Sequence, residues 1–214
     1  GQCVLLTGEA GIGKSRITAE LLRRLEGTHH FRIRQQCSPY YADTPLWPVV
    51  QQLRHAAGLD PDVGNPENLN RLTALLAKGD EETIGALPAL ADAVGLVPPD
   101  SEIFERFGPQ QRRVITLQAL AAQPVGLSRA RPVLMVLEDA HWADPSTLEL
   151  YGLVLDAIGD RPVMILMTSR PEGGPRLTAH PHVTRLALNR LSRAAAQELI
   201  RELMSDTATS SEIL

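Results

Sequence analysis

The chain has 214 residues, 43% of them hydrophobic and 21% charged, a composition that can form one main globular domain without a disulfide framework. Its net charge of −4 argues against a broad nucleic-acid-binding face. No apolar run reaches the roughly 18 residues of a membrane-spanning helix. The cysteines Cys3 and Cys37 lack metal-site spacing and indicate reduced thiols, so we expect a cytoplasmic protein. A start at Gly1, two residues before a core strand, predicts a piece of a longer protein.

The strongest motif follows the apolar stretch 3–7, which we predict to be the first strand. Residues 8–15 fit the pattern G-x-x-x-x-G-K-[ST], in which backbone N–H groups converge on a phosphate at the start of a helix. Lys14 supplies a positive charge for the β and γ phosphates, and the Ser15 hydroxyl is a predicted Mg²⁺ ligand. We predict nucleotide contacts for Gly8, Glu9, Ala10, Gly11, Ile12, Gly13, Lys14, Ser15 and Arg16.

The next segments predict a second strand and then a long helical region. Residues 31–37 alternate apolar and polar side chains, as a strand does. Residues 45–123 have apolar positions at helical spacing, and glycines and prolines divide them into roughly four helices. We therefore expect a helical insertion between the second and third strands.

Three further strands complete the predicted sheet. The apolar runs 132–137 and 162–168 are typical of parallel strands that helices cover on both faces, and 182–188 alternates as an edge strand does. A last helix is expected over 192–204, with Ser192 as its N-cap. Five strands separated by helices predict an α/β fold of the P-loop NTPase type, a doubly wound parallel sheet with its ligand at the carboxyl ends of the strands.

Two acidic residues directly follow the third predicted strand, where a phosphate loop needs a site for Mg²⁺ and a group that orients water. We assign Glu138 to the metal and Asp139 to the water. The commoner order places Asp first, so the two roles could be exchanged. Arg170 ends the next strand and is a candidate γ-phosphate sensor, with a surface ion pair as the alternative. The predicted catalytic set is Glu138, Asp139, Lys14 and Arg170.

Other residues near these acids have both a structural and a functional interpretation. Asp144 precedes a proline and predicts a helix N-cap. His141 and Trp142 lie where a substrate or a partner domain would approach, but capping and packing explain them equally well. Arg112 and Arg113 are candidate arginine fingers, although a solvated helix face is the simpler explanation.

Taken together, these residues resemble a known family. The loop 8–15, the run 138–150 (EDAHWADPSTLEL) and the tripeptide 170–172 are similar to the AAA-like ATPase domain of STAND signal-transduction NTPases. The resemblance covers nearly the whole chain. It is closest to bacterial proteins in which this ATPase follows a class III adenylate/guanylate cyclase domain and precedes tetratricopeptide repeats, and similar domains occur in large LuxR-type regulators.

The resemblance implies ATP and Mg²⁺ as cofactors, a P-loop NTPase core over 1–188 and the start of a truncated helical lid over 189–214. The family's Gly-Arg-Glu box, which helps form the adenine pocket, would lie before this chain. Preference for ATP over GTP follows from the resemblance alone.

The leading functional hypothesis is an ATP-binding and ATP-hydrolysing signalling switch within a larger regulator. One alternative is a small-molecule kinase in which the insertion 45–123 closes over an acceptor. Another is a scaffold that holds nucleotide without turnover. The expected partners are nucleotide and other domains of the parent protein, with a homo-oligomer as a further option, and neither a membrane nor direct nucleic acid.

Overall fold

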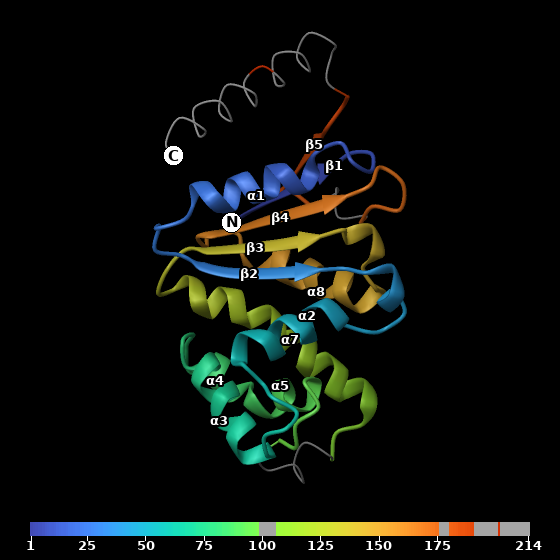
Figure 1. Ribbon diagram of the computed structural model, residues 1–214. Coiled ribbons are helices and arrows are strands. Elements are labelled where there is room, and N and C mark those ends of the chain that lie inside the picture. The colour runs from blue at the N-terminus through green and yellow to red at the C-terminus, as the bar shows by residue number, and fades with distance from the viewer. Residues whose placement is uncertain (99–105, 176–179, 191–200, 202–214) are drawn as a thin grey trace, which may run out of the picture.

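The computed structural model describes residues 1–98, 106–175, 180–190 and 201. Within these ranges five strands form one sheet in the order β2-β3-β4-β1-β5, and every neighbouring pair is parallel (Figure 1). The order places the last strand at an edge, as its alternating sequence predicted. The strands are β1 Gln2–Thr7, β2 Phe31–Gln36, β3 Val133–Glu138, β4 Val163–Ser169 and β5 Val183–Ala187.

Helices cover both faces of the sheet, which confirms the predicted doubly wound α/β fold (Figure 1). Helix α1 (Lys14–Arg24) lies on one face, and α2 (Trp47–Ala57), α7 (Pro109–Ser128) and α8 (Pro145–Ala157) lie on the other. Because strand side chains alternate between faces, the two sides bury different residues. The α1 face buries a small apolar cluster formed by Leu6, Leu134, Val136 and Leu166.

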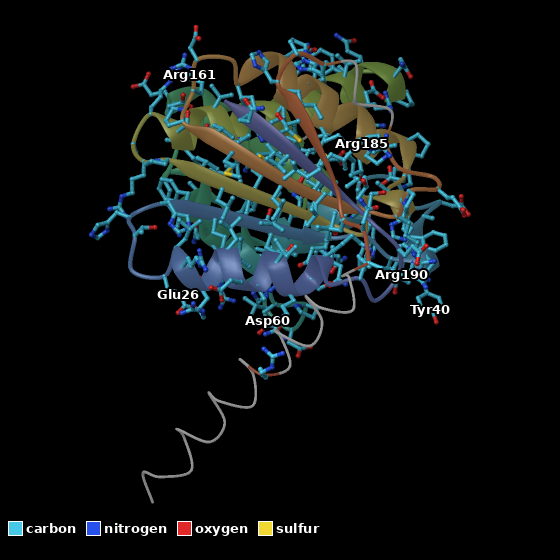
Figure 2. All side chains as sticks on the ribbon, turned by 90° about the horizontal axis from the view of Figure 1, so that it is seen from above. Glu26, Tyr40, Asp60, Arg161, Arg185 and Arg190 are labelled. Carbon is cyan, nitrogen blue, oxygen red and sulfur yellow. The ribbon has the colours of Figure 1, made fainter. Side chains whose placement is uncertain are left out.

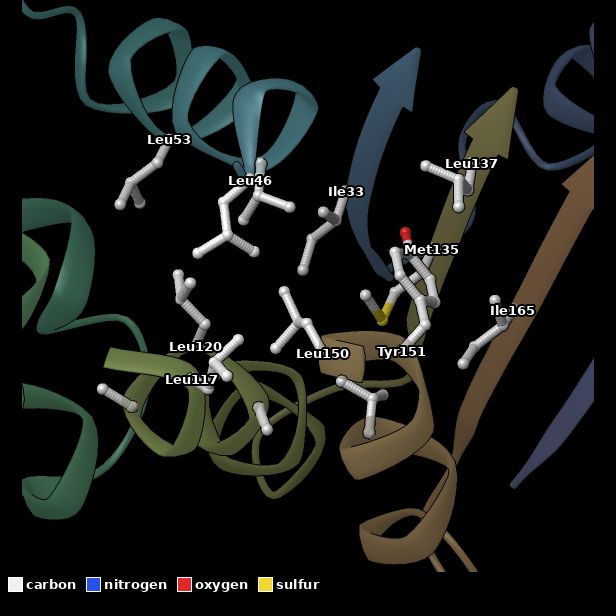
Figure 3. Close-up of a cluster of buried hydrophobic side chains, with 14 of the residues drawn as sticks. Ile33, Leu46, Leu53, Leu117, Leu120, Met135, Leu137, Leu150, Tyr151 and Ile165 are labelled. Carbon is white, nitrogen blue, oxygen red and sulfur yellow. The ribbon is translucent and has the colours of Figure 1, made fainter. Parts of the chain in front are cut away.

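The opposite face carries the large core, where side chains of the sheet meet α2, α7 and α8 (Figure 3). Leu137 and Ile165 point from the sheet into this core, and Tyr151 of α8 is fully buried there. The Tyr151 hydroxyl donates a hydrogen bond of 2.8 Å to Oε1 of Gln35. Strand β3 is buried at every position and β4 at every position except Met164, as expected for strands covered on both faces.

The helical insertion is present, and it shares the large core with the sheet. It contains α2, α3 (Asn65–Leu76), α4 (Glu81–Gly85) and α5 (Leu87–Ala93), with α3 to α5 on the far side of α2 and α7 from the sheet (Figure 1). Helix α7 continues through Pro124 and ends at Ser128, five residues beyond the expected end of the insertion. Proline removes a backbone hydrogen bond there, but Val125 and Leu127 pack against the core and favour the longer helix.

The strands point the same way, so the loops that carry the predicted site residues meet at one edge of the sheet. Apart from residue 201, the expected helix 192–204 lies outside the described residues. None of the helices within the described ranges combines the length and the apolarity that crossing a bilayer requires.

Candidate functional site

The loop after β1 has a backbone that glycine makes possible. Gly11 and Gly13 have φ angles of 74° and 110°, a region that other residues rarely adopt, and Gly13 is the N-cap of α1. Gly8 is buried, and a Cβ atom added to it would lie 2.7 Å from Cγ2 of Ile12. The Gly8 N–H donates to the carbonyl oxygen of Ser169 at 3.2 Å, which fixes the start of the loop to the end of β4.

Lys14 is buried at the first position of α1, and its charge is compensated by the loop itself. Its ammonium group donates to the carbonyl oxygens of Gly8 and Glu9, both at 2.8 Å. Only 8% of this lysine is exposed. The phosphate loop thus holds a positive charge at its centre, and those two carbonyls accept hydrogen bonds from the ammonium group.

A cavity of about 410 Å³ opens beside this loop. Asp139 and Arg170 line it from the ends of two other strands, so three of the four predicted catalytic residues meet there. Among the predicted nucleotide contacts, the lining includes Ala10, Gly11, Gly13, Lys14, Ser15 and Arg16. Its volume is within the range of pockets that hold small ligands.

Strand pairing explains why these side chains converge. Thr7 lies opposite Ser169 in the β1–β4 register, so the residue that follows each strand, Gly8 and Arg170, reaches the same edge. Strand β3 is the other neighbour of β4, and Asp139 follows it directly. Asp139 has a positive φ of 55°, and its N–H donates to Oγ1 of Thr168 at 3.0 Å. This backbone turn aims Asp139 away from the strand direction and toward the loop.

Glu138 has a different environment from Asp139, although the two are adjacent. It is the last residue of β3, only 6% exposed, and it is not among the residues that line the cavity. Its Oε1 accepts a hydrogen bond from Nε of Arg34 on β2 at 2.8 Å, and Nη2 of the same guanidinium forms an ion pair with this oxygen at 2.7 Å. Its role as a metal ligand therefore remains a prediction, and no motif in the sequence indicates its partner Arg34.

His141 lies in the short helix η2 (Ala140–Trp142) just after the acidic pair. Both of its ring nitrogens are inaccessible, and neither has a hydrogen-bond partner among the residues that the structure describes. Burial lowers the pKa of His141; the charge of Asp139 opposes this shift, and those of Arg170 and Lys14 add to it. The surroundings of His141 thus favour its neutral ring, close to the charged site residues. The neighbouring Trp142 is 37% exposed.

Two other predicted groups have structural partners. Asp144 is 2% exposed and caps α8, because its Oδ1 accepts from the N–H groups of Ser146 and Thr147 at 2.9 and 3.0 Å. Arg113 pairs with Glu149 on α8, so it belongs to a contact between α7 and α8. Arg112 lies in the lining of a separate cavity near the start of α7, away from the phosphate loop.

The loop has one further contact that the sequence did not predict. The Glu9 carboxylate accepts from Nη2 of Arg190, which follows β5, at 2.9 Å. Both side chains are more than half exposed, so the pair contributes little stability. It does connect the phosphate loop to the segment after the edge strand, and Figure 2 shows Arg190 at the same end of the molecule as Tyr40.

These residues fit a nucleotide phosphate and its metal ion. The loop presents backbone N–H groups at a helix start together with Lys14, a combination that suits phosphate oxygens. Ser15 and the acidic pair offer hydroxyl and carboxylate oxygens, the hard donors that Mg²⁺ prefers, and phosphates commonly complete its coordination.

Comparisons with known proteins give the family of the chain. A family model described as "AAA ATPase domain" matches residues 1–166. An uncharacterized protein of Rhizobium meliloti (strain 1021) is 30% identical over 193 residues, which are 89% of this chain and 18% of that protein. The chain thus spans about a fifth of the length of that relative.

Solved structures show more distant similarity. A STAND protein with a tetratricopeptide repeat sensor from Pyrococcus horikoshii is 16% identical, with a TM-score of 0.38 over 94% of this chain and 23% of that one. A nucleotide-free ATP-binding cassette from an ABC transporter is 12% identical, with a TM-score of 0.37 over 88% of this chain and 78% of that one. The family match covers most of the chain and includes the phosphate loop, the acidic pair and the strands beside them; the chain belongs to the AAA ATPase domain family.

Proposed function

We propose that this chain is the ATP-binding and ATP-hydrolysing switch domain of a larger signalling protein. The observation that carries the proposal is the convergence of Lys14, Asp139 and Arg170 on one cavity beside the phosphate loop. An anion-binding loop, a carboxylate and a second cation in one cavity are the groups that phosphoryl transfer to water requires. The AAA ATPase family match supports the same chemistry.

Each predicted site residue has a proposed role. Lys14 binds the β and γ phosphates, exchanging its two loop carbonyls for phosphate oxygens without becoming an unpaired buried charge. Ser15 and Glu138 hold Mg²⁺, which when bound neutralises negative charge on the phosphates. Asp139 orients the attacking water and accepts its proton. Arg170 contacts the γ-phosphate and so responds to its loss.

A small-molecule kinase is less well supported. That function would require the insertion 45–123 to close over an acceptor beside the γ-phosphate. The described lining of the cavity includes no residue from this insertion, and α3 to α5 lie beyond α2 and α7 (Figure 1). Water from the open side of the cavity is the simpler acceptor.

The switch role rests on the resemblance to STAND domains and on the length of the Rhizobium meliloti relative, of which this chain covers 18%. We propose that residues 1–188 form the NTPase core and that a lid begins at 189. The proposed partners are other domains of the parent protein, a cyclase or DNA-binding output domain and tetratricopeptide repeats. The Glu9–Arg190 pair provides a direct contact between the phosphate loop and the first residues of this lid.

Single-turnover hydrolysis tests the catalytic part of the proposal. Radiolabelled ATP is mixed with excess protein and Mg²⁺, and phosphate release is followed for the wild type and the Asp139→Asn variant. We expect the variant to bind ATP normally and to hydrolyse it at least about 10²-fold more slowly, since a positioned proton acceptor contributes 10²- to 10⁴-fold to the rate. Asp62→Asn, an exposed aspartate on the insertion, is the matched control. Equal rates in wild type and Asp139→Asn would overturn the role of Asp139, and a wild-type rate no faster than that of ATP without protein would favour a scaffold that holds nucleotide without turnover.

A further inference from the structure

The strongest unexplained feature of the site is the ion pair between Arg34 and Glu138. Two nitrogens of one guanidinium, Nε and Nη2, converge on the same oxygen, Oε1 of Glu138. Within the described part of the chain, no group forms a hydrogen bond to Oε2 of this carboxylate. The two oxygens are thus distinct, one engaged by Arg34 and one available to another ligand.

The sheet itself produces this asymmetry. Strands β2 and β3 are parallel neighbours, with Arg34 opposite Val136 and Gln36 opposite Glu138. Side chains two residues apart on a strand share a face, so Arg34 and Glu138 lie diagonally on the same face. That face is the one covered by α1, because Val136 belongs to the apolar cluster against which Leu21 and Leu22 pack. The ion pair is therefore on the side of the sheet where the phosphate loop enters α1.

Because Glu138 is buried, its carboxylate depends on the ion pair with Arg34. Its side chain is 8% exposed, whereas that of Arg34 is 57% exposed at the edge of the sheet. A buried carboxylate without a partner is strongly unfavourable, and its rotamer would be free to turn toward other donors. Arg34 compensates the charge and fixes which oxygen is occupied, while its own guanidinium remains largely in solvent.

We propose that Arg34 is a positioning residue for the metal-side carboxylate: it occupies Oε1 of Glu138 and thereby presents Oε2 to the Mg²⁺ that accompanies bound nucleotide. The inference rests on the proposed function, in which Glu138 is a metal ligand. Ligating carboxylates are commonly oriented by outer hydrogen bonds, and loss of such a partner typically costs 10- to 100-fold in metal affinity. Arg34 has no part in binding the nucleotide itself.

The test separates metal coupling from nucleotide binding. The dissociation constant for ATP is measured by calorimetry in EDTA and in saturating Mg²⁺, and the ratio of the two constants reports the coupling. We expect Arg34→Ala to leave the constant in EDTA unchanged and to reduce the ratio by about 10-fold or more. Binding of Mn²⁺ to the protein–ATP complex, followed by electron paramagnetic resonance, provides a second readout that does not depend on turnover.

Three variants sharpen the result. Arg32→Ala removes an exposed arginine from the same face of β2 and should leave the ratio at the wild-type value. Glu138→Gln should reduce the ratio at least as much as Arg34→Ala. Arg34→Gln retains a hydrogen-bond donor without the charge, is expected to recover part of the coupling, and serves as the test if Arg34→Ala fails to fold.

The outcomes distinguish this inference from the function on which it rests. If wild-type protein binds no ATP under either condition, the proposed function fails. If wild-type protein binds ATP with a clear Mg²⁺ effect and Arg34→Ala keeps the same ratio, or increases it, Arg34 does not position the ligand and the inference is overturned. An unchanged ratio in Glu138→Gln would overturn it as well, because Glu138 would then not be the metal-side carboxylate.

Discussion

Replacing Asp144 with alanine should destabilise the fold strongly, because its carboxylate joins two helices. Oδ1 accepts from Ser146 and Thr147 in the first turn of α8, and also from the N–H of Leu46 at the start of α2, at 3.1 Å. Oδ2 accepts from the Thr147 hydroxyl. Loss of an N-cap costs about 1 kcal/mol, and a buried N–H left unpaired costs about 1–3 kcal/mol. We expect a total loss of about 2–4 kcal/mol in the free energy of unfolding.

Urea unfolding followed by circular dichroism measures this loss, and thermal unfolding should show a midpoint about 5–15 °C lower. Asp144→Asn is the matched variant, since its amide oxygen can still accept the three backbone N–H groups. It should lose about 1 kcal/mol, the contribution of the charge and of the Thr147 hydroxyl bond. If Asp144→Ala unfolds at the wild-type urea concentration, or if Asp144→Asn is equally damaging, the account of this carboxylate as a helix connector is wrong.

Three other predictions use buried groups. Tyr151→Phe leaves Oε1 of the buried Gln35 without its donor and should cost about 1–3 kcal/mol in urea unfolding; a neutral effect would mean that water replaces the hydroxyl. Burial raises the pKa of Cys3 and of Cys37 to about 12, so neither thiol should react with a maleimide at neutral pH until urea unfolds the chain. Labelling of the native protein would contradict the burial of these thiols. Burial lowers the pKa of His141, so the unfolded chain binds a proton at this histidine more readily than the folded protein does. The free energy of unfolding should therefore fall as the pH drops through the ordinary histidine range. His141→Gln should reduce that fall when urea unfolding is compared at about pH 8 and about pH 5. Equal pH dependence in both proteins would argue against a buried neutral ring.

Much of the fold was predictable because the strongest signals are local. The phosphate loop, the apolar runs at β3 and β4 and the alternation at β5 each depend on a few neighbouring residues, and all five strands lie where the sequence placed them. The end of α7 was not predictable, since Pro124 is a helix-breaking signal that tertiary packing overrides.

Of the candidate site, only the residues that directly follow a predicted strand or form the phosphate loop could be predicted from the sequence. Asp139 and Arg170 follow strands whose carboxyl ends must meet, so their convergence follows from a parallel sheet. The partner of Glu138 required the strand order, because Arg34 comes close only when β2 lies beside β3. The hydrogen bond from the N–H of Leu46 to Asp144 joins residues 98 positions apart. It depends on the positive φ of Leu46, and no local sequence pattern indicates that φ angle.

The most direct test of the central claim is a calorimetric titration of Mg·ATP and of Mg·GTP into the protein, into Lys14→Ala and into Lys78→Ala, which replaces the only other lysine of the chain. We expect saturable binding of Mg·ATP to the wild type and to Lys78→Ala, its loss in Lys14→Ala, and weaker binding of Mg·GTP. Equal binding to the wild type and Lys14→Ala, or no binding to the wild type, would contradict the assignment of this loop as a nucleotide site.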